Sequence, residues 1–318
     1  RINGIVPPSN TFVVTNRLQE DLTYQQLPFI PRENILIEPV GRNTAPCIGL
    51  AASLIHRIDP KGVMIVLPAD HVIRDVGEFL RVLGVAVKVA DESNALITIG
   101  IKPSRPETGY GYIQFDEDLL AGNPYQNDGV LRVKTFAEKP NLETAERFLQ
   151  SGDFLWNSGM FVWKAQSILK EIEVHLPDLH TQLKTLTQKP GSPEFKAALE
   201  QAYGIIRGIS IDYGVMEKAG NVFVAKGDFG WSDVGSWDEV VRLASADSEG
   251  NCVKGLVITK DAVGNYVDAG KKVVAVIGVQ DLIVVTTDDA VLVCKKERSQ
   301  DVKEIVDYMR RKQMNDQL

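Results

Sequence analysis

In the first half of the chain, short runs of β-branched and other apolar residues alternate with stretches in which apolar residues recur at helical spacing. The short runs predict strands at residues 12–15, 35–37, 63–67 and 96–99. The intervening patterns predict one helix that begins near residue 43 and another over residues 76–91. Alternation of this kind is typical of parallel βαβ units, so this half predicts an open, three-layer α/β sheet.

The first of these helices carries signals at both ends. Asn43 and Thr44 are residue types that cap helices, and Pro46 is tolerated in a first turn. Pro60 and Gly62 then end the helical pattern. The start of this helix is therefore well defined by the sequence.

The remainder of the chain changes character twice. In the middle, the patterns predict strands at residues 112–115, 130–137, 160–163 and 222–225, a helix at 142–150, and a proline-interrupted helical stretch at 167–202. From Cys252 onward, short strand-like runs follow one another without crossover helices, at residues 256–259, 273–277, 282–286 and 291–294, before an amphipathic pattern at 300–311. We therefore expect a mixed α/β domain over residues 1–250 and a small β domain with a terminal helix over residues 251–318.

Composition narrows the classes of protein that fit. The 318 residues are 44% hydrophobic and 24% charged, which is typical of a folded globular chain. The formal net charge is −7 and no basic block occurs, so no nucleic acid partner is expected. The three cysteines are widely separated and lack metal-ligand spacing, which favours a reducing compartment and a cytoplasmic location. The longest apolar runs fall short of the roughly 20 residues of a membrane span, so no membrane association is expected.

Candidate binding residues follow the predicted strands. In open α/β sheets, ligands bind beyond the carboxyl ends of strands. The second strand leads into a turn from Glu38 to Pro46 and then into a helix N-terminus, which offers N–H groups to an anion; an ordinary capped turn is the alternative. The third strand leads into Asp70, which could be a metal ligand but is more often a cap, and His71 is better treated as a structural neighbour.

Further segments that combine glycine, polar and charged residues occur later in the chain. Gly111 lies in a glycine-containing turn that permits close backbone approach, although a tight turn explains it equally well. Glu138 and Lys139 are adjacent at a strand end, and both can reach one ligand only if the strand is already breaking at the next residue. Asn157 and Asp233 lie in similarly built turns, and Asp233 could be merely a helix N-cap.

The absence of several motifs also restricts the chemistry. The chain has no G-x-S-x-G elbow, no G-x-x-x-x-G-K-[ST] loop, no H-E-x-x-H and no complete G-x-G-x-x-G. Serine hydrolases, P-loop NTPases, zincins and ordinary dinucleotide enzymes are therefore disfavoured. A magnesium-assisted reaction on phosphates fits better, because the chain offers two carboxylates distant in sequence, a lysine, and turns whose backbone groups can approach a ligand.

The order of these segments resembles one family across nearly the whole chain. The segments are E-P-V-G-R-N-T-A-P, L-P-A-D-H, F-A-E-K-P, W-N-S-G-M-F, I-S-I-D-Y-G-V-M-E-K and G-W-S-D-V-G-S-W, followed by a C-terminal V-V-A-V-I-G-V-Q-D-L-I-V-V-T-T-D-D-A-V-L-V-C run. Together they resemble the mannose-1-phosphate guanylyltransferases, also called GDP-mannose pyrophosphorylases. The resemblance implies an α/β fold with a Rossmann-like mixed open sheet flanked by helices, and a small C-terminal β-helix-like domain.

The resemblance also implies an activity and its metal. Such enzymes transfer GMP from GTP to mannose 1-phosphate, forming GDP-mannose and releasing pyrophosphate. Asp70 and Asp233 match the family's carboxylates for Mg²⁺, and Lys139 matches the residue that holds the sugar 1-phosphate. A homodimer is expected, because the small C-terminal domain would leave apolar surface exposed on its own.

Substrate-binding roles follow from the same resemblance. Glu138 would bind sugar hydroxyls, with Gly111 and Asn157 lining the sugar pocket. The turn made by Gly41, Arg42, Asn43 and Thr44 would lie beside the nucleoside. Glu38 is expected to read the base, because a carboxylate can accept from both N1–H and the 2-amino group of guanine.

One departure from the family pattern bears on activity. The family opens with a strand and a glycine-rich G-G-x-G-x-R-L loop, followed by a lysine, and none of this occurs here. We expect a leading strand, loop and helix to be missing, on the order of 30 or more residues, which makes the chain as given a candidate for inactivity. The alternatives are a nucleotidyltransferase for another base or sugar, and a non-catalytic relative that binds sugar nucleotide and regulates a partner.

Overall fold

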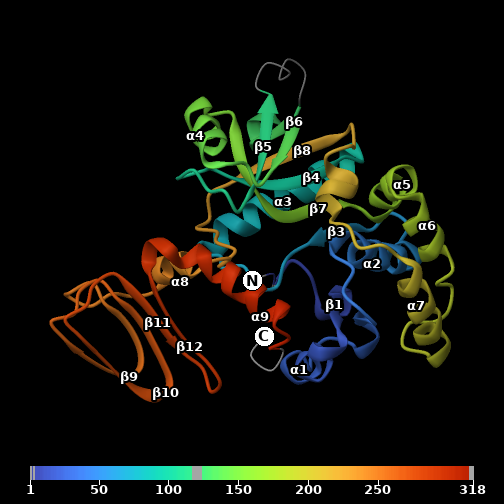
Figure 1. The fold of residues 1–318 in the computed structure, drawn as a ribbon. Coiled ribbons are helices and arrows are strands. Elements are labelled where there is room, and N and C mark those ends of the chain that lie inside the picture. Colours follow the sequence, from blue (N-terminus) through green and yellow to red (C-terminus); the bar gives the residue numbers. More distant parts are fainter. Residues whose placement is uncertain (1, 3, 117–123, 315–318) are drawn as a thin grey trace. The chain divides into compact units, whose positions relative to one another are not determined.

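The computed structural model describes residues 2, 4–116 and 124–314, and the chain divides into two compact units (Figure 1). The first unit comprises Arg1–Ala69 and Ile73–Trp231. The second comprises Asp70–Val72 and Ser232–Leu318. A short excursion of the chain after the third strand thus belongs to the second unit.

The first unit is an α/β structure. Its helices are α1 (Glu20–Gln26), α2 (Thr44–Ile58), α3 (Val76–Ser93), α4 (Leu142–Ser151), α5 (Ala165–His175), α6 (Pro177–Lys184) and α7 (Pro193–Ile205), with a π-helical turn, η6 (Asp212–Met216). Its strands are β1 (Val13–Asn16), β2 (Ile35–Glu38), β3 (Val63–Val66), β4 (Leu96–Ile101), β5 (Gly111–Asp116), β6 (Val130–Glu138), β7 (Phe154–Lys164) and β8 (Val222–Gly227).

Within the described residues, six of these strands form one mixed sheet in the order β3-β7-β4-β8-β6-β5. Strands β4 and β8 pair in parallel, whereas β7 runs antiparallel to both β3 and β4. Strands β1 and β2 pair in parallel as a separate two-stranded sheet. The predicted fold class is confirmed. The expectation of simple parallel βαβ units needs correction, because β7 lies between β3 and β4 and removes the direct pairing of these parallel strands.

The cap predicted at the start of α2 is present, and α4 has capping residues of the same kinds. The Asn43 side chain accepts a hydrogen bond from the N–H of Thr44 at the start of α2. The Asn141 side chain accepts from the N–H of Thr144 at the start of α4. Gly152 ends α4 in a left-handed conformation, with φ of +79°, which glycine adopts without steric cost.

Apolar side chains at alternate strand positions belong to two different large clusters of buried residues. Leu96 and Trp163 belong to the first cluster, together with residues of α2, α5, α6 and α7. Ile97, the neighbour of Leu96 on β4, belongs to the second, together with Phe79 and Leu83 of α3. Successive strand residues point to opposite faces, so the sheet is covered by helices on both sides.

The second unit is built mainly of strands. It contains α8 (Trp237–Leu243), β9 (Cys252–Lys260), β10 (Tyr266–Ile277), β11 (Leu282–Thr286), β12 (Val291–Lys295), a 3₁₀ segment η7 (Lys296–Asp301) and α9 (Val302–Arg311). Strands β9, β10 and β11 pair in parallel without helices between them, and β12 pairs antiparallel with β11.

Two buried asparagines hold successive coils of this unit together. The Oδ1 atom of Asn251 accepts from both the backbone N–H and the side-chain amide of Asn265. Asn265 in turn donates to Val279 and accepts from the N–H of Leu282. This ladder satisfies backbone groups at the turns, and the small C-terminal β-helix-like domain predicted from the sequence is confirmed.

In the described part of the chain, no helix is long and apolar enough to span a membrane.

Candidate active site

Glu38, the last residue of β2, is a buried carboxylate with only 8% of its surface exposed. Its Oε1 accepts a hydrogen bond of 2.8 Å from the hydroxyl of Tyr203, a fully buried residue of α7. Burial raises the pKa of Glu38, and the Tyr203 hydrogen bond acts in the opposite direction. The sequence indicated Glu38 but gave no signal for Tyr203.

The turn from Gly41 to Thr44 is attached to residues 209–211. The backbone of Ile209 donates to Arg42 and accepts from Ala45, at 3.2 and 3.0 Å. The Thr44 hydroxyl accepts from the N–H of Ile211 at 2.9 Å. The first N–H groups of α2, those of Thr44 and Ala45, therefore donate within the protein, so the expected anion-binding role of this helix start loses two donors. Around Gly41, a Cβ atom would meet no described atom within 4 Å.

A second group of predicted residues meets where β5 and β6 begin and end. Gly111 pairs with Glu138, and a Cβ atom at residue 111 would overlap Glu138 Oε1. Strand β6 ends at Glu138, and Lys139 adopts a left-handed conformation with φ of +47°. As a result the two neighbouring side chains share one side, with Lys139 Nζ 3.5 Å from Glu138 Oε2. The strand thus breaks here, as it must if both side chains are to reach one ligand, and the absent side chain at residue 111 leaves room for the Glu138 carboxylate.

Asn157 of β7 connects this group to a carboxylate that the sequence did not single out. Its side-chain N–H₂ donates to Asp212 Oδ1 at 2.7 Å. Burial raises the pKa of Asp212, and the hydrogen bond from Asn157 counteracts that rise. The signal available in the sequence was one acidic residue inside the apolar I-S-I-D-Y-G-V-M run.

Asp70 and Asp233 both belong to the second unit. An antiparallel bridge joins Val72 to Ser232, and antiparallel pairing puts the two carboxylate-bearing residues at the same end of that bridge. The Asp70 side chain is 84% exposed. The Oδ1 atom of Asp233 accepts from the N–H of Gly235 at 3.0 Å.

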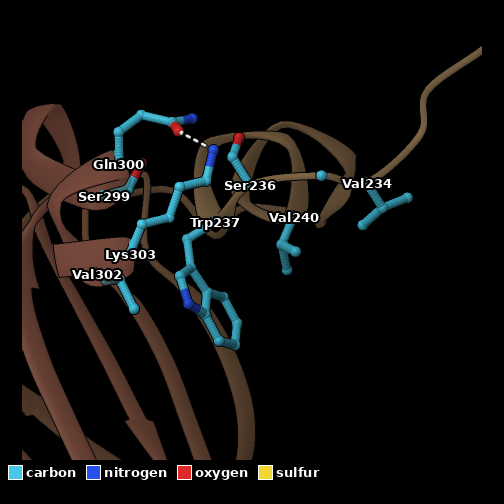
Figure 2. Close-up of a pocket in the computed structure, with 9 residues that line it drawn as sticks. Val234, Ser236, Trp237, Val240, Ser299, Gln300, Val302 and Lys303 are labelled. Carbon is cyan, nitrogen blue, oxygen red and sulfur yellow. Dashed lines mark hydrogen bonds between the residues drawn. The ribbon is translucent and has the colours of Figure 1, made fainter. Parts of the chain in front are cut away.

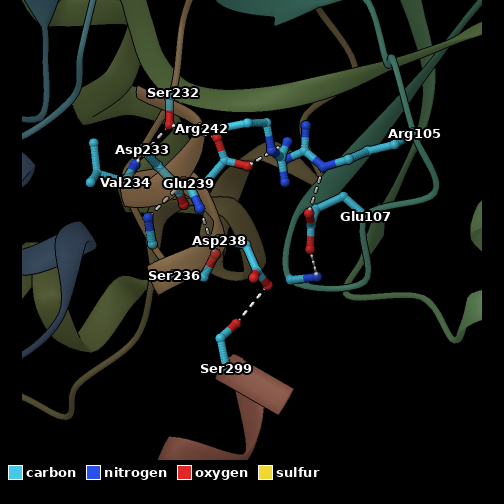
Figure 3. A network of polar contacts seen from close by, with 12 residues as sticks. Arg105, Glu107, Ser232, Asp233, Val234, Ser236, Asp238, Glu239, Arg242 and Ser299 are labelled. Atoms are coloured by element: carbon cyan, nitrogen blue, oxygen red, sulfur yellow. Dashed lines mark hydrogen bonds and ion pairs between the residues drawn. The ribbon is translucent and has the colours of Figure 1, made fainter. Parts of the chain in front are cut away.

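Residues on both sides of Asp233 form a polar network at the turn into α8 (Figure 3). The Ser232 hydroxyl donates to Glu239 Oε2 at 3.2 Å, and Glu239 forms an ion pair with Arg242 at 2.9 Å. Ser236 caps α8 by accepting from the N–H of Glu239. Asp233 is thus not the cap of this helix, which leaves the metal-ligand interpretation of its carboxylate in place.

The described residues contain no ready-made cluster of three or more His, Cys, Asp or Glu side chains that could hold a metal. Mg²⁺ is commonly held by one or two carboxylates together with substrate phosphates, and it keeps several waters. Two carboxylates at one end of a short bridge fit that mode of binding.

A cavity of about 350 Å³ lies in the second unit, beside the turn that leads into α8 (Figure 2). Trp237 and Val240 of α8 line it together with Val302 and Lys303 of α9. The Lys303 ammonium donates to the side chain of Gln300. Neither Asp70 nor Asp233 is among its lining residues, although Val234 and Gly235, which directly follow Asp233, are.

Comparison with family models identifies both parts of the chain. Residues 2–250 match the nucleotidyl transferase model, and residues 255–309 match the MannoseP isomerase/GMP-like beta-helix domain model. The chain belongs to the nucleotidyl transferase family. Its first unit thus carries the fold of a transferase of nucleotidyl groups, and the second contains the accompanying β-helix domain.

Relatives and solved structures agree with this assignment. Mannose-1-phosphate guanylyltransferases from Salmonella montevideo and Klebsiella pneumoniae are each 39% identical, over 98% and 96% of this chain. The chain spans 65% and 64% of the length of these two proteins. A crystal structure from Thermus thermophilus, named mannose-1-phosphate geranyltransferase, matches with a TM-score of 0.83 and 33% identity, covering 97% of this chain and 87% of that one. A structure named mannose-6-phosphate isomerase from Helicobacter pylori matches with a TM-score of 0.57 and 26% identity, covering 70% of this chain and 84% of that one.

Proposed function

We propose that this nucleotidyl transferase transfers GMP from GTP to mannose 1-phosphate, forming GDP-mannose and pyrophosphate. The observation that carries the proposal is the 37–40% identity to mannose-1-phosphate guanylyltransferases over 95% or more of this chain. The site residues add chemical support, because an acid, a lysine and an amide lie close together at the edge of the first unit's sheet.

In this reaction an oxygen of the sugar phosphate attacks the α-phosphorus of GTP. A new phosphorus–oxygen bond forms, the bond to the β-phosphate oxygen breaks, and pyrophosphate leaves, so no covalent enzyme intermediate is needed. The Lys139 ammonium would hold the sugar phosphate, and the Glu138 carboxylate would accept hydrogen bonds from sugar hydroxyls. Catalysis of phosphoryl transfer rests mainly on such positioning and on charge stabilisation.

We propose Asp70 and Asp233 as the residues that hold Mg²⁺. When bound, this ion neutralises negative charge on the phosphates. We expect the like charges of these two carboxylates to oppose each other when no metal ion is bound. Glu38 and the turn of Gly41, Arg42, Asn43 and Thr44 would contact the guanosine.

Two further properties belong to the same proposal. Leu256 and Val273 pair in β9 and β10 with 62% of each residue's surface exposed, and an apolar strip of this kind favours a homodimer. Sedimentation of a monomer at working concentration would contradict it.

Cys47, Cys252 and Cys294 are free thiols, which supports a cytoplasmic location.

Pyrophosphate release tests the proposed activity. The full polypeptide would be incubated with Mg²⁺ and each pairing of GTP, ATP or UTP with mannose 1-phosphate or glucose 1-phosphate. We expect the GTP and mannose 1-phosphate pair to give the highest kcat/KM. Preference for another pair would favour a nucleotidyltransferase of different specificity, and binding of GDP-mannose without turnover by any pair would favour a regulatory relative.

A further inference from the structure

We propose that Asp212 is a positioning residue for the sugar 1-phosphate, acting by fixing the side-chain amide of Asn157 beside Glu138. The inference rests on the proposed function, and it deepens that proposal by adding a residue for which neither the sequence motifs nor the family matches give a role. Asp212 acts through its neighbours, so it is not assigned to the reacting atoms themselves.

The first support is the way in which the Asn157 amide is held. Its N–H₂ donates to Asp212, as above, while its Oδ1 accepts from the N–H of Gly159 at 3.1 Å and from the Thr98 hydroxyl at 3.3 Å. Both ends of the amide are therefore engaged, and the orientation of the group is defined by donors on one side and an acceptor on the other. Without Asp212, the amide would lose the partner that specifies its N–H₂ end.

The second support is that backbone hydrogen bonds and burial hold the segment around Asp212. It begins the π-helical turn η6, in which the N–H of Glu217 donates to the Asp212 carbonyl at 3.0 Å. Single π-helical turns are rare and frequently occur at functional sites. The preceding residue, Ile211, is fully buried and donates its N–H to Thr44. A residue held on both sides in this way can transmit its position to Asn157.

The third support is electrostatic. Burial raises the pKa of Glu138 first, and the negative charge of Asp212 raises it further, with a smaller contribution from Glu217. The Lys139 ammonium acts in the opposite direction. If Glu138 accepts hydrogen bonds from sugar hydroxyls as a carboxylate, binding of the sugar phosphate improves as the pH rises through the pKa of Glu138. On the acidic limb of the pH profile, affinity for the sugar phosphate rises with pH. Removal of the Asp212 charge should lower the pKa of Glu138 and move this acidic limb to lower pH.

Asp212→Ala and Asp212→Asn separate the hydrogen bond from the charge. The alanine variant loses both, whereas the asparagine variant keeps a carbonyl oxygen that can accept from Asn157. Glu217→Gln is the matched control, because it removes a neighbouring charge and leaves the Asn157 contact intact. Steady-state kinetics would be measured for mannose 1-phosphate and for GTP from pH 5 to pH 9, with thermal unfolding of each variant as a check of folding.

We expect Asp212→Ala to raise KM for mannose 1-phosphate about tenfold, the loss typical of one hydrogen bond to a charged group, and to leave KM for GTP within about twofold. Asp212→Asn should recover most of that affinity and still show the acidic limb at lower pH. Glu217→Gln should move the limb less and leave both KM values near wild type.

Three results would overturn the inference. The first is equal loss of affinity in the alanine and asparagine variants, and the second is equal loss toward GTP and mannose 1-phosphate. The third is an unchanged pH profile in Asp212→Asn, which keeps the test valid even if the alanine variant fails to fold. Failure of the proposed function would look different: the wild type would prefer another sugar 1-phosphate, and the same comparison of variants would then be made with that substrate.

Discussion

Replacement of Glu38 by Gln distinguishes a role in reading guanine from a role in folding. Gln keeps the length of the side chain and an oxygen that can accept from the Tyr203 hydroxyl, which lies 2.8 Å from the carboxylate. It loses the charge and half of the acceptor capacity that would meet N1–H and the 2-amino group of guanine. We expect kcat/KM for GTP to fall by roughly 1.5 to 3 kcal/mol, or about 10- to 150-fold. ITP lacks the 2-amino group and should lose much less.

Glu38→Gln should lower activity but leave thermal stability at pH 7 unchanged or higher. The pKa of Glu38 is raised in the folded protein, chiefly by burial. A carboxyl group of this kind contributes stability that is fully present below its unfolded pKa and is lost as the pH rises through its folded pKa. At pH 7 the buried charge therefore costs stability, so Glu38→Gln should unfold at the same or a higher temperature than wild type. The difference should shrink or reverse near pH 4.

Kinetics with GTP and ITP, together with thermal unfolding at pH 4 and pH 7, would check these expectations. Equal losses for GTP and ITP would mean that Glu38 does not read the 2-amino group. No loss for either nucleotide, combined with a lower melting temperature at pH 7, would refute the reasoning and return Glu38 to a structural role beside Tyr203.

Four other substitutions test separate parts of the account. Asp70→Asn or Asp233→Asn should cut turnover severely while the melting temperature without ligand stays constant or rises, and wild-type turnover in either variant would remove that carboxylate from the mechanism. Lys139→Met should raise KM for mannose 1-phosphate and leave KM for GTP nearly constant; the reverse pattern would show that its assignment is wrong. Gly100→Ala should lower the free energy of unfolding in urea by about 1 to 3 kcal/mol, because the new Cβ would lie 2.5 Å from a methyl group of Val224; an unchanged urea midpoint would mean that this part of the core relaxes freely.

Local features of the fold were predictable wherever the chain carries its own signals. Asn43 and Asn141 cap helices as their residue types indicate, and Gly152 ends α4. Strand β7 was predicted only at residues 160–163, whereas it spans Phe154–Lys164. Its first half includes Asn157 and Gly159, which have low strand propensity, and pairing with neighbouring strands stabilises it nevertheless.

Sheet order was not predictable in the same way. The position of β7 between β3 and β4 depends on pairings over about 60 to 100 residues of sequence separation, such as Met64 with Trp163. No local pattern in either strand specifies such a partner.

The site shows the same division between local and long-range information. Glu138 and Lys139 could be proposed because they are adjacent, and the conformation that brings them together is the left-handed backbone of Lys139 directly after the strand end at Glu138. Tyr203 and Asp212 lie 165 residues from Glu38 and 55 residues from Asn157, respectively, and their roles emerge only from contacts in the folded chain.

The path of the α-phosphorus tests the central proposal most directly. The full polypeptide would be incubated with Mg²⁺, mannose 1-phosphate and GTP labelled with ³²P either at the α- or at the γ-phosphate, and the products would be separated. Transfer of GMP predicts that the α-label appears in GDP-mannose and the γ-label in pyrophosphate. Release of the γ-label as inorganic phosphate, or absence of the α-label from a mannose-containing product, would contradict the account.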